Sequence, residues 1–243
     1  MTSKKLRVAV LFGGKSAEHE VSLQSARNVI EALDKEKYDI VPIGIDKEGR
    51  WLLAETSNYL LNSGDPKRIR LNNSSATVAV VPQSSGTLME LASRREAPRI
   101  DVFFPVLHGP FGEDGSIQGL LKLANVPFVG SGVLGSAVSM DKDVMKRLFR
   151  DAGIRIADFV VVHPGDAVSF ATIADKLGSP VFIKPANLGS SVGVHKVGNE
   201  TELGPALVDA FAYDTKVLIE QAIIGREIEV SVLGNESPIA SVP

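Results

Sequence analysis

Residues 182–194 read Phe-Ile-Lys-Pro-Ala-Asn-Leu-Gly-Ser-Ser-Val-Gly-Val, and this stretch decides how the second half of the chain is interpreted. An apolar run delivers Lys184, a Gly/Ser-rich loop follows over 187–193, and a second apolar run returns at 194–197. Backbone N–H groups of such a loop can surround phosphate oxygens, hydroxyls add donors, and a lysine adds a positive point charge. The pattern is equally typical of a hairpin whose lysine faces solvent, so this segment alone leaves both interpretations open.

The apolar runs that follow carry acidic residues at strand spacing. Residues 217–221 read Val-Leu-Ile-Glu-Gln and place Glu220 near the end of a predicted strand. Glu227 and Glu229 share one face of a second predicted strand over 227–233. A carboxylate at a strand end suits a ribose hydroxyl or an adenine amino group. For Glu229 we prefer the simpler interpretation of an acid in water on an edge strand.

The region around these segments alternates strands and helices, with the strands in close pairs. We predict helices at 141–152, 170–177 and 201–212, and strands at 159–162, 181–185, 194–197, 217–221, 227–233 and 238–242. Close pairing favours an α+β layer of hairpins with helices on one face over a purely parallel sheet.

The first half of the chain has the pattern of an open parallel α/β domain. The apolar runs 7–12 and 38–45 flank a helix that Ser16 is expected to cap, which makes a βαβ opening. We predict a short turn and strand over 46–54, strands at 77–81, 100–107 and 126–129 and a helix at 116–124, with an otherwise irregular connection over 55–99. This module is expected to close near residue 140.

Two side chains lie where the predicted strands of the first module end. Glu18 follows the first strand at the start of a helix, and His108 ends the strand over 100–107 just before a glycine loop. Ligands of open α/β sheets bind at such exits, so we expect the two to converge on one crevice. His19, His163 and His195 are interpreted as surface or loop histidines.

Two glycine-rich segments imitate nucleotide motifs. Gly14-Lys15-Ser16 matches the tail of a P-loop, but the position of the first P-loop glycine holds Ala9 inside a strand. Residues 130–135, Gly-Ser-Gly-Val-Leu-Gly, match the dinucleotide fingerprint, yet Asp151, at the spacing of the ribose-binding acid, falls at the end of a predicted helix. A glycine-rich turn between modules is the preferred interpretation of 130–135.

Composition narrows the class of protein. The 243 residues are 44% hydrophobic and 23% charged, as in ordinary globular proteins, and the net charge of -3 indicates no nucleic-acid or membrane partner. Cysteine is absent, which excludes disulfides and thiolate metal sites. The first residues run straight into a strand pattern without a leader, so a cytoplasmic protein is expected. Because 238–242 reads as a strand with no closing helix, we expect the sequence to be part of a longer protein.

Taken together, these segments resemble the D-alanine–D-alanine ligases. The matching runs, in family order, are Leu-Phe-Gly-Gly-Lys-Ser-Ala-Glu-His-Glu-Val-Ser-Leu at 11–23, Leu-His-Gly at 107–109 with Gly-Glu-Asp-Gly-Ser-Ile-Gln-Gly at 112–119, Ser-Met-Asp-Lys at 139–142, the runs 183–185 and 189–193, and Arg-Glu-Ile-Glu at 226–229. The resemblance implies an N-terminal α/β substrate domain at 1–141, an ATP-grasp central domain at 142–224, and the start of a truncated C-terminal ATP-grasp domain at 225–243. It also implies ATP, Mg²⁺ (or Mn²⁺) and D-alanine as ligands, a D-alanyl phosphate intermediate, a role in peptidoglycan synthesis, and a homodimer.

The resemblance also implies roles for single residues. Lys142 and Lys184 match the family's phosphate-binding lysines, while Ser190 and Ser191 match its glycine-rich loop, one serine on ATP phosphate and the other in a closing network with Glu18. The remaining implied roles are adenine binding by Glu220, Gln221, Ala222 and Ile223, ribose binding by Glu227, binding of the first D-alanine by Glu18 (ammonium) and His108 (carboxylate), and catalysis by Glu18 and Ser190. The family's metal ligands are expected beyond Pro243, and Leu188 departs from the expected polar loop residue.

Other interpretations remain open. A D-alanine–D-lactate ligase shares the fold, and other ATP-grasp ligases share the lysines but not the segments around Glu18 and His108. A non-catalytic nucleotide-binding module is the alternative from another class of protein. Because the expected metal ligands lie outside these residues, we expect the 243-residue chain alone not to make D-alanyl-D-alanine.

Overall fold

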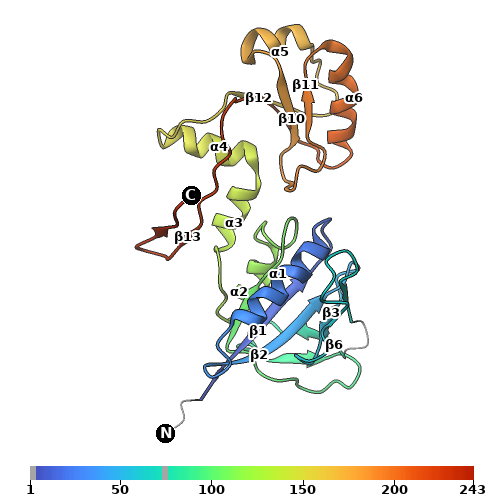
Figure 1. The fold of residues 1–243 in the computed structure, drawn as a ribbon, viewed down its shortest axis with the longest axis vertical. Helices are drawn as coiled ribbons and strands as arrows, with labels where there is room; N and C mark the ends of the chain where they lie inside the picture. The colour runs from blue at the N-terminus through green and yellow to red at the C-terminus, as the bar shows by residue number, and fades with distance from the viewer. Residues whose placement is uncertain (1–3, 73–75) are drawn as a thin grey trace.

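The computed structural model describes residues 4–72 and 76–243 and contains two lobes, each built on its own sheet. Figure 1 shows the lobe that contains β1, α1 and α2 at one end and the lobe that contains β10, α5 and α6 at the other, with α3 and α4 between them. The mixed architecture predicted from the sequence, a parallel α/β module followed by an α+β layer, is confirmed.

The first sheet has six strands in the order β7-β6-β3-β2-β1-β8. Their bounds are β1 (Leu6–Gly13), β2 (Tyr38–Ile45), β3 (Trp51–Leu53), β6 (Ala76–Val80), β7 (Leu88–Glu90) and β8 (Val102–Pro105). β1 pairs in parallel with both β2 and β8, whereas β3, β6 and β7 extend the sheet through antiparallel pairs. The short connections from β2 to β3 and from β6 to β7 allow only antiparallel pairing, and the parallel pairs are those of β1 with β2 and with β8.

The two faces of β1 are both buried, which explains its unbroken apolar sequence. Val8, Val10 and Phe12 face one core, where α1 (His19–Ala32) contributes Leu23, Ala26 and Ile30. Ala9 and Leu11 face the other core, which α2 (Ser116–Leu123) covers with Ile117 and Leu121. The helices therefore lie on opposite faces of the sheet, and the loops that follow β1 and β8 meet at one edge.

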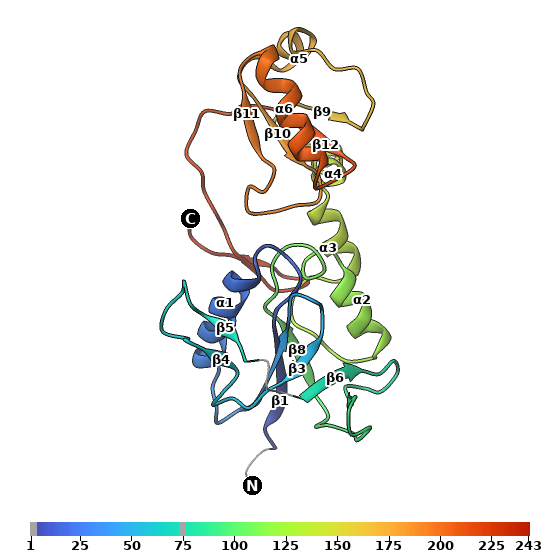
Figure 2. The same cartoon turned by 90° about the vertical axis from the view of Figure 1, so that its right-hand side faces the viewer.

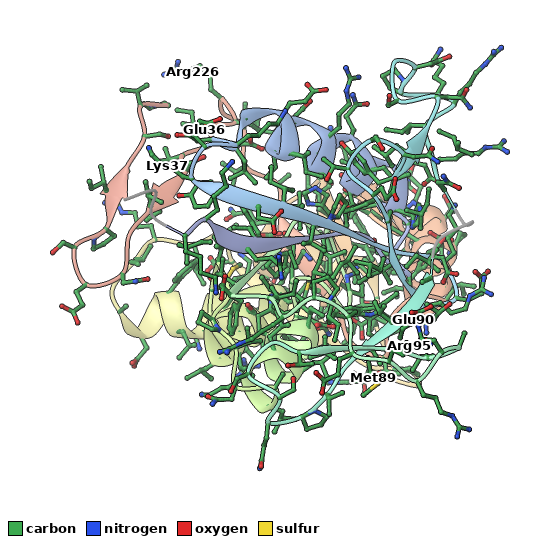
Figure 3. All side chains as sticks on the ribbon, turned by 90° about the horizontal axis from the view of Figure 1, so that it is seen from below. Glu36, Lys37, Met89, Glu90, Arg95 and Arg226 are labelled. Atoms are coloured by element: carbon green, nitrogen blue, oxygen red, sulfur yellow. The ribbon has the colours of Figure 1, made fainter. Side chains whose placement is uncertain are left out.

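Several predictions for this lobe need correction. The connection over 55–99 contains more strands than the single one predicted, namely β7 and the short pair β4 (Leu60–Leu61) and β5 (Arg70–Leu71). The turn after β7 is held by the backbone hydrogen bond from Glu90 N to Arg95 O, 2.9 Å, and Met89, Glu90 and Arg95 lie together at one side of the molecule (Figure 3). Strands of two or three residues are too short to show an alternating pattern, so whether such a strand forms depends on the strand that it pairs with.

Several elements of this lobe begin or end at other residues than predicted. The strand predicted at 126–129 is reduced to one bridge between Phe103 and Phe128, and the strand at 100–107 is shortened to β8. α1 begins at His19, and Glu18 rather than Ser16 occupies its cap position, without a side-chain cap. Ser16 Oγ instead donates to the main-chain oxygen of His108, 2.7 Å away.

The linker between the lobes is helical. α3 (Val133–Met140) begins inside the segment predicted as a glycine-rich turn, so that prediction was wrong from Val133 onward. α4 (Lys142–Asp151) follows directly, as predicted, and Asp141 caps it by accepting from the backbone N–H groups of Asp143 and Val144. Asp141 is thus the single residue between α3 and α4, and its side-chain cap marks where the second helix begins.

The second sheet has the order β11-β10-β12-β9 and is antiparallel throughout. Its elements are β9 (Phe159–Val162), α5 (Phe170–Leu177), β10 (Val181–Pro185), β11 (His195–Val197), α6 (Glu200–Phe211) and β12 (Val217–Gln221). Both helices pack on one face, where Val181, Ile183, Val217 and Ile219 are fully buried. The predicted layer of hairpins with helices on one face is therefore confirmed.

After β12 the chain runs along the outside of the molecule. Residues 223–243 are exposed, and Figures 1 and 2 show this tail leaving the second lobe and running back toward the first. Only β13 (Val232–Leu233) and β14 (Ile239–Ala240) pair with each other. Of the strand predicted at 227–233, residues 227–231 are not a strand and only β13 forms. The strand predicted at 238–242 is shortened to β14, because this segment packs against neither of the two large sheets. Among the described residues no helix has the length and apolar composition needed to cross a bilayer.

Candidate functional site

A cavity of about 570 Å³ lies on the face of the second sheet opposite α5 and α6. The 187–193 loop and the segment that follows β12 line the same cavity, as the interpretation of a shared nucleotide requires. Its lining residues are Lys142, Ala157, Phe182, Lys184, Leu188, Gly189, Ser190, Ser191, Val194, Glu220, Gln221, Ile223, Gly225, Arg226 and Glu227. Every residue predicted to bind ATP lines this cavity except Ala222, which lies in the chain between the lining residues Gln221 and Ile223. Their role in ATP binding stays a prediction.

Strand alternation places the charged residues of the cavity. Along β10 the side chains of Val181 and Ile183 enter the helix-covered core, so those of Phe182 and Lys184 face the other way. Glu220 on β12 lies opposite Phe182 in the antiparallel register, on the same face. As a result the Lys184 ammonium reaches the Glu220 carboxylate and forms an ion pair with it.

Glu220 is the most enclosed acid of the cavity, with a side chain 11% exposed. One carboxylate oxygen accepts from Lys184, and the other accepts from Lys146 on α4 at 2.6 Å. Burial raises the pKa of Glu220, but the hydrogen bonds from Lys146 and Lys184 outweigh burial and hold that pKa below its ordinary value. The carboxylate is therefore charged at neutral pH despite its burial.

Lys142, the first residue of α4, ties that helix to the glycine-rich loop. Its backbone N–H donates to Ala186 O at 3.0 Å, and its ammonium donates to the main-chain oxygen of Leu188. Burial lowers the pKa of Lys142, and the nearby charge of Lys184 lowers it further. Two lysines therefore face the cavity close enough to repel each other, an arrangement that favours an anion between them. Leu188, the apolar departure from the family pattern, serves here through its carbonyl.

The 187–193 loop is held in an unusual conformation. Asn187 donates from its backbone and its side-chain amide to one oxygen of Asp214, at 2.8 and 2.9 Å. Ser190 and Ser191 have φ angles of 48° and 58°, the left-handed region that residues with a Cβ seldom adopt. A Cβ on Gly193, whose φ is 66°, would lie 2.9 Å from both Pro185 and Tyr213. The loop conformation thus depends on its anchors rather than on local preference.

Glu18 lies between the two lobes. Ser190 Oγ donates to one oxygen of Glu18, a contact that joins the first lobe to the glycine-rich loop of the second. The other Glu18 oxygen would be 2.7 Å from a Cβ on Gly109, whose φ is 71°, so a glycine at this position leaves room for the carboxylate. The side chain predicted to bind a substrate ammonium is thus in contact with the loop predicted to bind phosphate.

His108 lies in the loop beyond Pro105, the last residue of β8, rather than at the end of the strand as predicted. Its Nε2 is 3.0 Å from Ser25 Oγ on α1, and its main-chain oxygen accepts from Ser16. The loops that carry Glu18 and His108 are therefore hydrogen-bonded to each other, although the functions of both residues remain predictions.

The sequence interpretation missed residues that position the site rather than line it. Lys146 carries no motif of its own, but its spacing of four from Lys142 on a predicted helix was a signal that both share one face. Ser22 accepts from Gly13 N at 2.8 Å and donates to Val106 O, which joins the ends of β1 and β8.

The three histidines without a predicted role differ in their environment. His19 was expected at the surface, yet it is 5% exposed and its Nδ1 lies 2.7 Å from Gly14 O, because the glycine turn folds back over the start of α1. His163 is exposed beside Asp166, and His195 pairs at the surface with Asp209 at 2.6 Å. The expectation was therefore wrong for His19.

The two segments that imitate nucleotide motifs have different surroundings. Lys15, the lysine of the P-loop imitation, lies over the Phe111 ring, with its ammonium 5.2 Å from the ring centroid. Part of the 130–135 segment is the start of α3. In the part of the chain that the structure describes, no three His, Asp or Glu side chains come together in a way that could hold a metal ion.

Comparisons with known proteins identify the family of this chain. The family model described as "D-ala D-ala ligase N-terminus" matches residues 7–131, and the model described as "D-ala D-ala ligase C-terminus" matches residues 148–243. D-alanine–D-alanine ligase A of Chromobacterium violaceum is 57% identical over 98% of this chain, and that of Escherichia coli K12 is 54% identical over 98%. The chain spans 66% of the length of both relatives.

Solved structures give the same result. The D-alanine–D-alanine ligase from Coxiella burnetii superposes with a TM-score of 0.85 at 40% identity, covering 98% of this chain and 69% of that one. The VanG D-Ala:D-Ser ligase from Enterococcus faecalis has a TM-score of 0.82 at 38% identity, covering 98% and 68%.

Proposed function

This chain belongs to the D-alanine–D-alanine ligase family, and from that premise we propose that it takes part in the ATP-dependent joining of two D-alanines. One observation carries the proposal. Lys142, Lys184 and the 189–191 loop line one cavity, and Glu220 and Glu227 line the same cavity. Cations and loop N–H groups suit a triphosphate, and carboxylates suit the amino and hydroxyl groups of a nucleoside.

In the proposed arrangement the adenine lies along Glu220, Gln221, Ala222 and Ile223. Glu220 accepts a hydrogen bond from the adenine amino group, and Glu227 accepts from the ribose. Lys142, Lys184 and one serine of the 190–191 pair bind phosphate oxygens. The exposed position of Glu227 and its place on the cavity wall support a ligand that enters from solvent.

The first D-alanine is proposed to bind beside Glu18 and His108. Glu18 holds its ammonium group, and His108 lies near its carboxylate. The hydrogen bond between Ser190 and Glu18 supports this placement, because it brings the first substrate and the phosphate loop within one network. Glu18 and Ser190 are on this basis the catalytic residues that we propose in this chain.

The chemistry proceeds in two displacements. A carboxylate oxygen of the first D-alanine attacks the γ-phosphorus, the bond to the bridging oxygen breaks, and ADP leaves. The amine of the second D-alanine then attacks the acyl carbon of the D-alanyl phosphate, and inorganic phosphate leaves. Both partners of the first step are anions, so Lys142 and Lys184 act by offsetting their repulsion.

The family implies Mg²⁺ (or Mn²⁺) beside the phosphates. No cluster of acidic side chains or histidines in residues 4–72 and 76–243 fits such an ion. We further propose a cytoplasmic place in peptidoglycan synthesis and a homodimer, on the strength of the family alone.

Calorimetric titration of ATP into the 243-residue chain, with and without D-alanine, tests the proposal. We expect ATP to bind in the micromolar range and D-alanine to strengthen that binding through the Ser190–Glu18 contact. Binding of ATP that D-alanine leaves unchanged would favour a non-catalytic nucleotide-binding module. Absence of ATP binding would contradict the proposal.

A further inference from the structure

Lys146 is a buried cation with no assigned role. Its ammonium lies 2.6 Å from Glu220 Oε1 and donates to the main-chain oxygen of Ala157 at 3.0 Å. It also lies over the Phe159 ring, 5.3 Å from the ring centroid. Ala157 and Phe159 belong to the segment at 157–159, and Glu220 belongs to β12. The Lys146 side chain thus connects α4 to the end of β12 and the start of β9.

The two lysines that share Glu220 differ in their access to the cavity. The side chain of Lys146 is 8% exposed, whereas that of Lys184 is 28% exposed and lines the cavity wall. Lys184 therefore faces the space that a ligand in the cavity would occupy. Lys146 is enclosed and fixed by its own contacts to Ala157 and Phe159.

The contacts of Lys184 conflict with its proposed role in nucleotide binding. In the structure its ammonium is paired with Glu220, but the proposed function requires the same ammonium on a phosphate. When Lys184 leaves, Glu220 would remain as a buried carboxylate. An unpaired buried charge is strongly destabilising, so a second cation is needed at that moment.

We propose that Lys146 is a positioning residue that keeps Glu220 charged and in place while Lys184 moves from Glu220 to a nucleotide phosphate. This inference rests on the proposed function. It assigns the two oxygens of Glu220 different tasks: Oε1 stays with Lys146, and Oε2 is released by Lys184 for the amino group of the adenine.

A double-mutant cycle on ATP affinity tests the exchange. Lys146→Met keeps the length of the side chain but removes its charge, so among the described residues Lys184 becomes the only cation in contact with Glu220 and is harder to release. We expect the Kd for ATP to rise about tenfold or more, which corresponds to about 1.4 kcal/mol. In a Glu220→Gln background the neutral amide needs no counter-charge, and Lys146→Met should then raise the Kd less than about twofold further.

The matched control is Lys216→Met. Lys216 is another partly buried lysine of the same lobe, paired with Asp141 at 2.5 Å, and does not contact Glu220. It should lower thermal stability while leaving the effect of Glu220→Gln on ATP affinity unchanged. Equal losses of affinity from Lys146→Met in the Glu220 and Glu220→Gln backgrounds would overturn the proposal, because they would show a general effect on folding.

A ligand-free cycle separates failure of this inference from failure of the proposed function. Lys146→Met and Lys184→Met each leave Glu220 one cation, so each should lower the Tm modestly. Both together should lower it by about 5 °C more than the sum, because the carboxylate is then bare. Additive shifts would overturn the counter-charge role. If the wild-type chain binds no ATP, the proposed function fails, and this cycle alone decides whether Lys146 compensates Glu220.

Discussion

Lys184 and Glu220 owe their positions to the alternation of side chains along two antiparallel strands. Each strand sends its odd-numbered apolar residues, such as Ile183 and Ile219, into the core under α5 and α6. The even-numbered Phe182, Lys184 and Glu220 then face the cavity, whatever their chemistry. At this scale an apolar core dictates where the charged groups of the site are found, and a shift of register by one residue would bury both charges under the helices.

Lys184→Ala provides the most direct test at the residue scale. Loss of a charge-assisted contact to phosphate should raise the Kd for ATP roughly 10- to 100-fold, as measured by calorimetry. Lys176→Ala on α5 removes an exposed lysine of the same lobe and should leave the Kd within about twofold. An unchanged affinity in Lys184→Ala would show that this lysine does not contact the nucleotide.

Gly193→Ala tests the conformation of the loop. The added Cβ would lie 2.9 Å from Pro185 and Tyr213 at a φ of 66°, so we expect a loss of stability of about 1–3 kcal/mol by denaturant unfolding. Gly204→Ala is the matched control, because its Cβ meets nothing within 4 Å and a helical alanine is favoured. Similar stability of the two variants would mean that the loop tolerates other conformations.

α4 is the element that connects the cavity to the linker between the lobes. Its first turn carries Lys142 toward the loop, and its second turn carries Lys146 toward Glu220. The helix begins where Asp141 caps two backbone N–H groups, and the same carboxylate pairs with Lys216 at 2.5 Å. The start of the helix is thus tied by its cap to the residue that precedes β12.

This cap predicts a pH dependence of stability. Burial raises the pKa of Asp141, but the bonds from Lys216 and from Val144 N outweigh it and hold that pKa below its ordinary value of 3.8. A carboxylate with a lowered folded-state pKa stabilises the fold above its unfolded pKa, and this stability is lost as pH falls through the folded value. Acid should therefore lower the Tm in the window below about pH 4.

Asp141→Asn isolates this contribution. Asparagine also caps helices, so the variant should keep its helix cap. It should lose stability near pH 7 because the ion pair with Lys216 is gone, and its Tm should fall less than that of the wild type between pH 5 and 3. Asp175→Asn on the exposed side of α5 serves as the control and should follow the wild-type curve. Parallel Tm curves for wild type and Asp141→Asn would contradict the assignment.

At the scale of the whole molecule, two separately packed lobes must act on one set of ligands. The first lobe has cores on both faces of its sheet, and the second has one core under α5 and α6. The contact of Ser190 with Glu18 and the helices α3 and α4 hold the lobes in the arrangement seen in Figure 2. Catalysis of the proposed kind requires this arrangement, because the predicted substrate and phosphate residues lie on different lobes.

Ser190→Ala should loosen this arrangement. Removing one hydrogen bond worth about 1 kcal/mol changes the ratio of closed to open lobes by roughly fivefold, so the radius of gyration from small-angle scattering should increase. Ser191→Ala, which leaves the bond to Glu18 in place, should scatter like the wild-type chain. An unchanged profile for Ser190→Ala would show that the linker helices alone set the arrangement.

The sequence was informative wherever a periodic pattern ran long enough. The strands β1, β2, β10 and β12 follow from short apolar runs, and the helices α4, α5 and α6 follow from helical spacing of apolar residues. β7 and the whole of α3 were missed because a strand of three residues and a helix that begins among glycines show no such period. The strand predicted over 227–231 did not form because no neighbouring strand pairs with it there.

For the candidate site, the sequence by itself determined which residues carry useful chemistry and on which predicted elements they lie. Only the tertiary structure decided that Lys146 pairs with Glu220, that Ser190 contacts Glu18 across 172 positions of sequence, and that His19 is buried. The reason is physical. Local spacing sets the direction of a side chain on its own element, whereas its partner depends on how separate elements pack, and that packing is a property of the entire chain.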